Sequence, residues 1–304
     1  MVALTLDRGS AAPAVAGYAG AFITVMIWAT WILATRHTAA TALGTIDLGL
    51  IRYGIPALVL APVWLKTGLI PKTLPRGLLA MMVAGSGAVF FQVAAFAIHA
   101  TPASSVGVLL GGSMPLATAL IGVAFFGERP DRMRLVGFGA IIIGVTILLV
   151  RSLGASDGSA WTGYMLLPAA ATLWAIYTHA FRRSGLSALE GSALIAVWSF
   201  LIHLVLAAVS GTSTLMSVPL GEVGLQVLSQ GVLSGLAATL AYGFAVRRLG
   251  GTQAAAFTAL TPVLATFGGA ALLGETIGPF EIAAAVVTSA GVALSTGILS
   301  PKQA

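Results

Sequence analysis

Two pairs of aromatic residues stand at matching places in two apolar segments of this chain. Trp28 and Trp31 are three residues apart, as are Trp174 and Tyr177, so each pair lies on one face of a helix. Both pairs fall beyond the middle of their segments, whereas aromatic anchors of a membrane surface stand at helix ends. A buried indole N–H also needs an acceptor. We expect these four side chains to line a cavity; packing or interface anchoring is the alternative.

Two prolines occupy equivalent mid-segment positions, Pro115 and Pro262. A proline inside a helix removes one backbone hydrogen bond and clashes with the carbonyl four residues earlier. At membrane depth, carbonyls freed in this way are tolerated only where protein or a water-filled cavity satisfies them. We predict that both prolines break their helices around a central substrate site. An ordinary kink, accommodated by packing, is the alternative.

Polar side chains recur at helical spacing in two more apolar segments. Gln92, Phe96 and His99 follow an i, i+4, i+7 pattern and share one face. In the other segment, Gln226, Gln230 and Ser234 share a face in the same way. Amides at membrane depth are costly unless they are paired or hydrated. Cavity lining and hydrogen bonding between helices explain the pattern equally well, and both remain open.

Acidic residues are confined to the ends of the apolar segments and to loops. Carboxylate proton relays normally place an acid well inside the membrane, so we expect facilitated efflux down the substrate gradient. His99 and His203 are the titratable side chains that could carry protons in place of an acid. For His203 we expect a packing role and not proton transfer. The nine acids are Asp7, Asp47, Glu128, Asp131, Asp157, Glu190, Glu222, Glu275 and Glu281.

Three charged residues need separate interpretation. Glu128 and Glu275 each follow a glycine at the end of a small-residue segment, so we expect them to pair with loop cations or to cap the next helix. Arg52 lies near Asp47 at one membrane edge. It either meets a substrate carboxylate or, as is commoner for such arginines, extends to the interface.

The composition indicates an all-α integral membrane protein. Of 304 residues, 58% are hydrophobic and 8% are charged, against roughly 25% charged in ordinary globular domains. The apolar runs are about 18–23 residues long, enough for a helix to cross the bilayer. The absence of cysteine excludes disulfides, thiol catalysis and cysteine-ligated metal. We predict ten spans, at 17–35, 46–65, 77–98, 104–126, 134–151, 161–181, 187–209, 223–246, 252–273 and 279–298.

The basic residues predict the orientation. A nucleic-acid partner is the less favoured explanation of the net charge of +6, because the Lys and Arg residues lie in short loops. If the N-terminus is cytoplasmic, only Arg36, Arg52 and Arg151 of the 15 Lys and Arg residues fall outside. This bias places both termini in the cytoplasm. We expect a multi-pass protein of a bacterial inner membrane, with the lipid bilayer and a small-molecule substrate as its partners and no nucleic acid.

The chain contains an internal repeat. Residues 17–36 recur at 163–182, with Trp28 matched by Trp174 and Arg36 by Arg182. Further along, Pro115, Gly122, Gly127 and Glu128 recur as Pro262, Gly269, Gly274 and Glu275. We therefore predict two domains, 17–151 and 161–298, each of five helices. Because five is odd, the second repeat must insert upside down, as in transporters with inverted repeats around a central cavity. The internal copy also predicts that the first segment is retained rather than cleaved as a signal peptide.

Residues 95–129 and 245–275 carry a family resemblance. Each has a small-residue helix, a mid-span proline and a closing Gly-Glu, and each is similar to the EamA domain of the drug/metabolite transporter superfamily. The resemblance implies a ten-helix, proton- or gradient-linked exporter of small metabolites.

A narrower resemblance is to the YddG-type amino-acid exporters, through residues 173–177 and 258–264. That group has an aromatic residue before the proline of span four, where this chain has Met114, and Gly111 and Gly112 replace bulkier neighbours. The departure indicates a roomier and less selective cavity, in which we expect Gly112 to contact the substrate.

These patterns favour a secondary carrier that exports small neutral metabolites, chiefly amino acids with aromatic or hydrophobic side chains. The side chain of the substrate is expected to contact four residues, Trp28, Met114, Trp174 and Tyr177. We expect freed backbone carbonyls and the hydroxyls of Ser113, Thr258 and Thr261 to meet its ammonium and carboxylate groups. The alternatives are a multidrug carrier, a carrier of nucleotide sugars or phosphate esters, and, in another class, a channel or an intramembrane enzyme.

The sequence disfavours these alternatives. All three lysines lie in loops or the tail, whereas a phosphate carrier needs deep cations. The four histidines lack metalloprotease spacing and the chain has no phosphate-binding loop of the ATPase type. We expect no enzyme activity, no metal and no cofactor. The glycine-containing segments 134–151 and 279–298 are candidates for a homodimer surface.

Overall fold

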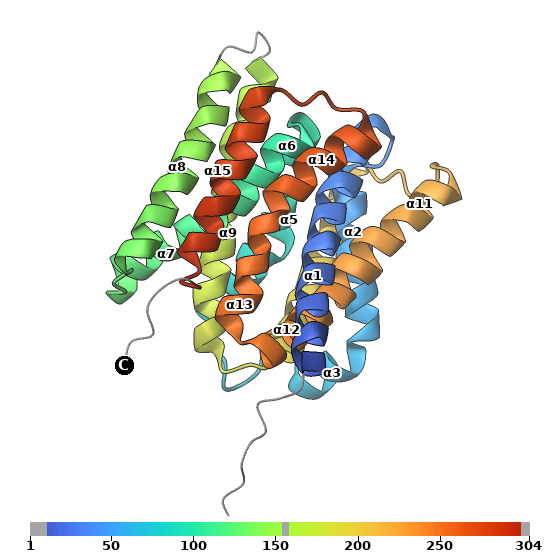
Figure 1. Ribbon diagram of the computed structural model, residues 1–304. Helices are drawn as coiled ribbons and strands as arrows, with labels where there is room; N and C mark the ends of the chain where they lie inside the picture. The colour runs from blue at the N-terminus through green and yellow to red at the C-terminus, as the bar shows by residue number, and fades with distance from the viewer. Residues whose placement is uncertain (1–10, 154–157, 299–304) are drawn as a thin grey trace, which may run out of the picture.

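The computed structural model describes residues 11–153 and 158–298, and every regular element within them is helical (Figure 1). The first half contains α1 (Ala11–His37), α2 (Thr45–Val59), α3 (Ala61–Thr67), α4 (Arg76–Ser86), α5 (Ala88–Ala100), α6 (Ala103–Val106), α7 (Ser113–Phe126) and α8 (Arg132–Leu153). The second half contains α9 (Gly158–Ser184), α10 (Ala188–Ser210), α11 (Leu220–Gln226), α12 (Ala238–Leu249), α13 (Gly251–Ala256), α14 (Thr261–Leu273) and α15 (Pro279–Ser295). Four short helices of other pitch are η1 (Thr38–Ala40), η2 (Gly107–Gly112), η3 (Val227–Ala237) and η4 (Phe257–Leu260).

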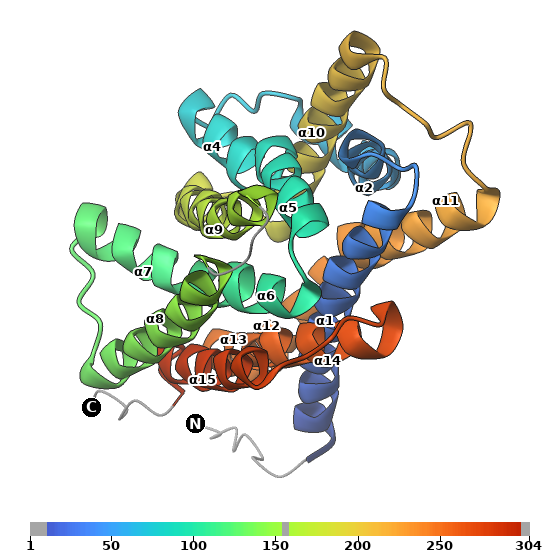
Figure 2. The same ribbon diagram turned by 90° about the horizontal axis from the view of Figure 1, so that it is seen from above.

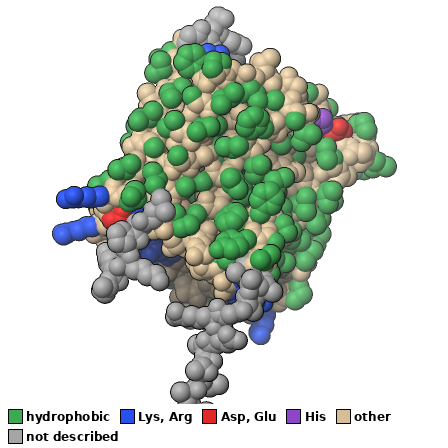
Figure 3. Space-filling model, viewed as in Figure 1, with side chains coloured by type: hydrophobic (Ala, Val, Ile, Leu, Met, Phe, Trp, Pro, Cys, Tyr) green, Lys and Arg blue, Asp and Glu red, His purple; other side chains and the backbone are tan. Residues whose placement is uncertain are grey.

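Length and apolarity identify an integral membrane protein. Within the described residues, seven helical segments are long and apolar enough to cross a bilayer, and the bent pair α2–α3 makes up to eight. Helix α15 is apolar but shorter, and α9, predicted as the sixth span, is not among the seven. Hydrophobic side chains are spread over the whole face in Figure 3, with Lys and Arg at its margins. The number of spans thus agrees only in part with the ten that the sequence predicts.

Both helices that carry the paired prolines change pitch beside them. The π-helical turn η2 leads directly into α7, whose third residue is Pro115. The 3₁₀ turn η4 leads directly into α14, whose second residue is Pro262. Proline is tolerated in the first turn of a helix, where its missing N–H has no intrahelical acceptor. Each proline therefore lies in the first turn of an α-helix that continues directly from a helix with a different hydrogen-bond pattern.

A sharp bend lies between α2 and α3. Helices α2 and α3 meet at 71°, at Leu60, between Pro56 and Pro62. A milder break at Gly87 separates α4 from α5. A Cβ at Gly87 would lie 2.1 Å from Ser199 Oγ, and that hydroxyl accepts a hydrogen bond from the N–H of Ala88 at 3.1 Å. Glycine is therefore required where α10 supports the break.

The helices form one bundle with distinct flanks. Helices α8 and α15 lie side by side at one margin, α10 lies at the opposite margin, and α5 and α6 run between them (Figures 1 and 2). A Cβ on Gly137 of α8 would lie 2.7 Å from the carbonyl oxygen of Gly291 on α15, so these two backbones touch. In Figure 1, α1 and α9, which carry the repeated sequence, run in opposite directions.

Candidate functional site

Three of the four predicted aromatic residues belong to one series of neighbouring rings. Trp31 of α1 stacks on Phe90 of α5 with ring centroids 6.4 Å apart, and Phe90 lies 5.5 Å from Trp174 of α9. Trp174 and Tyr177 are 5.1 Å apart. Trp31 and Phe90 are buried, whereas Trp174 and Tyr177 are half-buried. The fourth predicted residue, Trp28, lies apart from this series against Tyr242, with centroids 5.7 Å apart.

The two proline-bearing segments cross at their pitch changes. A Cβ on Gly107 of η2 would lie 2.9 Å from the Cα of Pro262, and one on Gly111 would lie 3.7 Å from Thr261. Gly112 does not face this crossing: its Cβ would meet the side chain of Thr288 on α15 at 2.4 Å. Gly111 is therefore the glycine beside Thr261, and the substrate role of Gly112 stays a prediction.

The predicted hydroxyl residues are close to the crossing but differ in availability. Ser113 and Thr261 are buried, at 6% and 7% exposure. The hydroxyl of Thr258 donates to the carbonyl of Ala255 at 2.7 Å, so it already has an acceptor on its own helix. Met114 is half-buried and packs against the same core as Trp174.

The side chain of Gln92 is held between helices. Its amide nitrogen donates to the carbonyl of Thr45 at 2.9 Å, and its oxygen accepts from the Thr45 hydroxyl at 2.7 Å. The same nitrogen lies 2.9 Å from Nε2 of His203, whose Nδ1 lies 2.7 Å from the carbonyl of Ser199. A proton on Nδ1 satisfies both contacts, because Nε2 then accepts. Gln92 and His203 thus join α5, α2 and α10, in the manner of interhelical hydrogen bonding.

Gln230 occupies the long π-helical segment η3, facing α1. Its amide nitrogen donates to the Thr35 hydroxyl at 2.9 Å, and the neighbouring Gln226 donates to the carbonyl of Ala34 at 3.1 Å. The oxygen of Gln230 accepts from Nη1 of Arg52 at 3.4 Å. π-Helical segments are uncommon and frequently occur at functional sites.

The other two residues predicted on the face of Gln92 are placed differently. Phe96 is 56% exposed. His99 lies near the end of α5, where its Nε2 is 2.9 Å from the hydroxyl of Thr38. The three residues of this face of α5 therefore have different surroundings. Gln92 contacts neighbouring helices, Phe96 is exposed, and His99 contacts Thr38 at the end of the helix.

Arg36 and Glu275 form an ion pair at one end of the bundle. Nε of Arg36 lies 2.9 Å from Oε1 of Glu275, and the side chains are 27% and 15% exposed. Oε2 of Glu275 accepts the N–H of Ala103 at 2.8 Å, which caps α6. Arg36 also donates to the carbonyl of His99. One carboxylate therefore ties together α1, α6 and the end of α14.

Arg182 and Glu128 form the sequence-equivalent pair. Nη1 of Arg182 lies 3.3 Å from Oε1 of Glu128, and the side chains are 61% and 45% exposed. Arg36 and Arg182 lie in the last turns of α1 and α9, and the glutamates come shortly after α14 and α7. Helices α1 and α9 end at opposite ends of the bundle, so the two ion pairs do as well (Figure 1). The first pair is therefore compact and half-buried, and the second is open to its surroundings.

The two glutamates share their local geometry. Each follows a glycine in the left-handed conformation, Gly127 at φ 64° and Gly274 at φ 67°, that ends a helix. Each N–H bonds at 3.1 Å to the carbonyl of an earlier glycine, Gly122 or Gly269. A Cβ on either earlier glycine would lie within 2.8 Å of the carboxylate. Both glutamates therefore pair with cations as predicted, but Arg36 and Arg182 lie in the last turns of α1 and α9 and not in loops.

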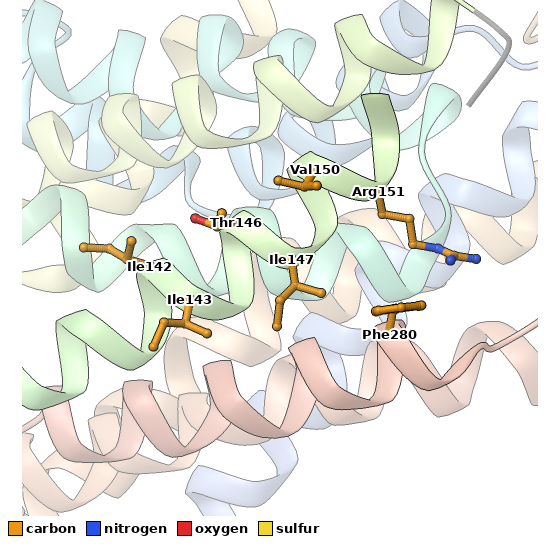
Figure 4. Close-up of a pocket in the computed structure, with 7 residues that line it drawn as sticks. All are labelled: Ile142, Ile143, Thr146, Ile147, Val150, Arg151 and Phe280. Atoms are coloured by element: carbon orange, nitrogen blue, oxygen red, sulfur yellow. The ribbon is translucent and has the colours of Figure 1, made fainter. Parts of the chain in front are cut away.

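Two hollows lie on the outside of the bundle. The larger, of about 580 Å³, is formed by α8 and α15, with Phe280 and Arg151 at one end (Figure 4). The smaller is formed by apolar residues of α10. Neither hollow is lined by a residue predicted for the substrate site. Among the described residues, no group of three or more His, Asp and Glu side chains is placed to hold a metal ion.

The sequence profile of one family matches two long stretches of the chain, residues 15–150 and 161–297. The chain belongs to the EamA-like transporter family. This membership agrees with the apolar helices and confirms the family resemblance carried by residues 95–129 and 245–275. An EamA-like transporter moves solutes across a membrane and is not an enzyme.

Two comparisons extend the family assignment. The chain is 33% identical over 188 residues to a Salmonella typhimurium (strain LT2) protein named a probable amino-acid metabolite efflux pump. That match covers 58% of this chain and 61% of the relative, so it spans about three fifths of the relative's length. The chain also resembles a solved structure titled only "Crystal structure of protein", with a TM-score of 0.60, 19% identity, and coverage of 97% of this chain and 100% of the other. This second likeness concerns the fold alone.

Proposed function

We propose that this EamA-like transporter exports amino acids and similar small neutral metabolites across a bacterial inner membrane, as a secondary carrier. The observation that carries the proposal is the family match along residues 15–150 and 161–297. The name of the Salmonella relative supports amino acids as the substrate class. The proposal includes ten spans in two inverted five-helix repeats, 17–151 and 161–298, with both termini in the cytoplasm.

The proposed mechanism is alternating access, with the two equivalent ion pairs as the closing contacts of opposite ends. An inverted repeat lets its halves exchange conformations, so that contacts made at one end are released at the other. The Arg36–Glu275 pair is compact and also caps α6, whereas the Arg182–Glu128 pair is exposed. A compact pair at the Arg36 end and an exposed pair at the Arg182 end are expected of a carrier that is closed at the Arg36 end. With the proposed orientation, that end is the outer one.

Substrate transport tests the function. The full-length protein in liposomes preloaded with an unlabelled amino acid is expected to show saturable uptake of the labelled amino acid, as counterflow. A panel of the twenty amino acids identifies the preferred side chains. Counterflow for none of them would contradict the proposal. Flux without saturation would indicate a channel, and release of a chemically altered product would indicate an enzyme.

Crosslinking tests the two closing contacts, and the chain has no cysteine of its own to interfere. The double variant Arg36→Cys with Glu275→Cys, treated with a short bifunctional methanethiosulfonate that joins the two thiols through disulfides, is expected to lose counterflow and to regain it on reduction. The variant Arg182→Cys with Glu128→Cys is expected to do the same, because each end must open once per cycle. Full counterflow through either crosslinked protein would contradict alternating access at these ends. The matched control, Arg151→Cys with Glu281→Cys, crosslinks another ion pair, between α8 and α15.

A further inference from the structure

Arg52 is a half-buried cation within α2 that has no acidic partner among residues 11–153 and 158–298. It lies seven residues after Thr45, the start of α2, which corresponds to about 10 Å along the helix. Its neighbours Ile51 and Tyr53 are 8% and 5% exposed, whereas Arg52 keeps part of its surface accessible. In the part of the chain that the structure describes, the ion pairs involve other basic residues. A guanidinium keeps its charge in proteins, so a charge at this depth needs compensation.

The acid nearest to Arg52 on α2 is hydrogen-bonded to other residues. Asp47 lies five residues earlier, on a different face of the helix. Its Oδ1 accepts from the hydroxyl of Ser213 at 2.6 Å, and its Oδ2 accepts from the N–H of Thr214 at 3.0 Å and from the Thr214 hydroxyl at 2.9 Å. Asp47 therefore anchors the loop before α11 and does not neutralise Arg52.

Aromatic faces and one amide provide the surroundings of the guanidinium. Its carbon lies 5.0 Å from the ring centroid of Trp31, 5.5 Å from Phe91 and 5.9 Å from Tyr53. Such contacts compensate a cation in part. Its hydrogen bond to Gln230 is long, at 3.4 Å. Tyr53 also shares a side-chain hydrogen bond with Arg52. A guanidinium has five N–H donors in a planar fork that fits a carboxylate, so these two hydrogen bonds leave donors for a further acceptor.

A second donor beside Arg52 also lacks an acceptor. Trp31, the ring closest to the guanidinium, is 6% exposed, and its Nε1 has no hydrogen-bond partner among the described residues. An indole N–H donates only, and a buried one without an acceptor is costly. An unpaired indole donor and an unneutralised guanidinium therefore occur together in one aromatic enclosure. A single anion could accept a hydrogen bond from the indole N–H and neutralise the guanidinium.

We propose that Arg52 and Trp31 form the binding site for the carboxylate group of the transported molecule. The inference rests on the proposed function and narrows it to substrates that carry a free carboxylate. Arg52 holds the carboxylate through its fork, Trp31 Nε1 donates to the same group, and Gln230 orients the guanidinium. The rings of Trp31 and Phe91 contact the first carbon atoms of the substrate. Amines, amides and esters of the same shape lack the charge that this site neutralises.

The first test uses the wild-type protein and needs no variant. Binding of a transported amino acid, of its carboxamide and of its methyl ester is compared by titration calorimetry in detergent. Because a charge-assisted hydrogen bond is worth more than a neutral one, we expect the amide and the ester, which keep the ammonium group but lack the carboxylate charge, to bind at least about tenfold more weakly. Equal binding of all three forms would overturn the proposal. Competition by chloride at constant ionic strength as strong as by acetate would also overturn it, because the site would then be one for inorganic anions.

The second test replaces the guanidinium group of Arg52. Arg52→Gln is expected to bind the amino acid and its carboxamide equally weakly, and Arg52→Lys, a point charge, to recover part of the discrimination. Arg76→Gln, at an exposed arginine that begins α4, is the matched control and is expected to keep the full discrimination. Unchanged discrimination in Arg52→Gln would refute the carboxylate site while amino-acid counterflow still supported the exporter. Absence of counterflow in the wild-type protein would refute the exporter itself.

Discussion

Arg36 and Glu275 meet across 239 residues of sequence, at an Nε–Oε1 distance of 2.9 Å. The contact joins the end of the first helix to Glu275, which comes directly after the C-cap Gly274 of α14, so it links the two halves of the chain directly. Its repeat equivalent, Arg182 with Glu128, makes the same kind of link with more exposed side chains. Burial is thus the main physical difference between two contacts of like chemistry.

Burial predicts unequal energies for the two ion pairs. A double-mutant cycle with Arg36→Ala and Glu275→Ala is expected to give a coupling energy of about 1–3 kcal/mol, because each single change leaves a half-buried partner unpaired. The same cycle with Arg182→Ala and Glu128→Ala is expected to give at most about 0.5 kcal/mol, because exposed pairs are weak. Thermal or denaturant unfolding in detergent measures both. Equal coupling energies would show that this asymmetry is absent in solution.

Two glycines of α8 differ sharply in their surroundings. Gly137→Ala places a Cβ 2.6 Å from the backbone nitrogen of Ser295, so α8 and α15 must separate, at a cost of about 1–3 kcal/mol in stability. Gly139 has open space around it. Gly139→Ala is therefore expected to be neutral or to stabilise the helix by up to about 1 kcal/mol. Unfolding of the two variants in the same detergent provides the comparison, and a Gly137→Ala protein as stable as the wild type would contradict the close backbone contact.

Trp174 is expected to select among side chains. It is half-buried beside Phe90 and Tyr177, and Trp174→Ala removes ring surface from this series. Aromatic pairs contribute about 0.5–1.5 kcal/mol beyond area burial, so we expect bulky amino acids to lose roughly threefold to tenfold in affinity, with small ones little changed. Trp161→Ala, at an exposed tryptophan near the start of α9, is the control. An unchanged ranking of substrates in counterflow would remove Trp174 from the site.

The placement of the acids predicts transport without proton coupling. Glu128 and Glu275 are in ion pairs at opposite ends of the bundle, and Asp47 is bonded to Ser213 and Thr214. Asp7 and Asp157 lie outside the described residues. With no acid assigned to the middle of a span, we expect efflux to continue when the pH gradient is collapsed at constant internal pH. Efflux from liposomes that stops under these conditions would reveal a proton-coupled step and direct attention to His99.

Some properties follow from the sequence because they depend on local composition and spacing. Apolar runs with few charges predict membrane helices whatever packs beside them. The Gly-Glu endings at Gly127-Glu128 and Gly274-Glu275 predict helix ends, because glycine readily adopts the left-handed conformation that both show. The proline positions likewise predict a disturbed helix, and both follow a change of helical pitch.

Other properties were decided only by the tertiary structure, because they depend on which neighbour each side chain meets. Helical spacing placed Gln92, Phe96 and His99 on one face, but packing gave them three different surroundings. Gly111 and Gly112 are adjacent in sequence, and only packing assigns one to Thr261 and the other to Thr288. The isolation of Arg52 is also a tertiary property. Its charge is evident in the sequence, whereas the commitment of Asp47 to a distant loop and the unpaired indole of Trp31 arise from contacts between segments far apart in the chain.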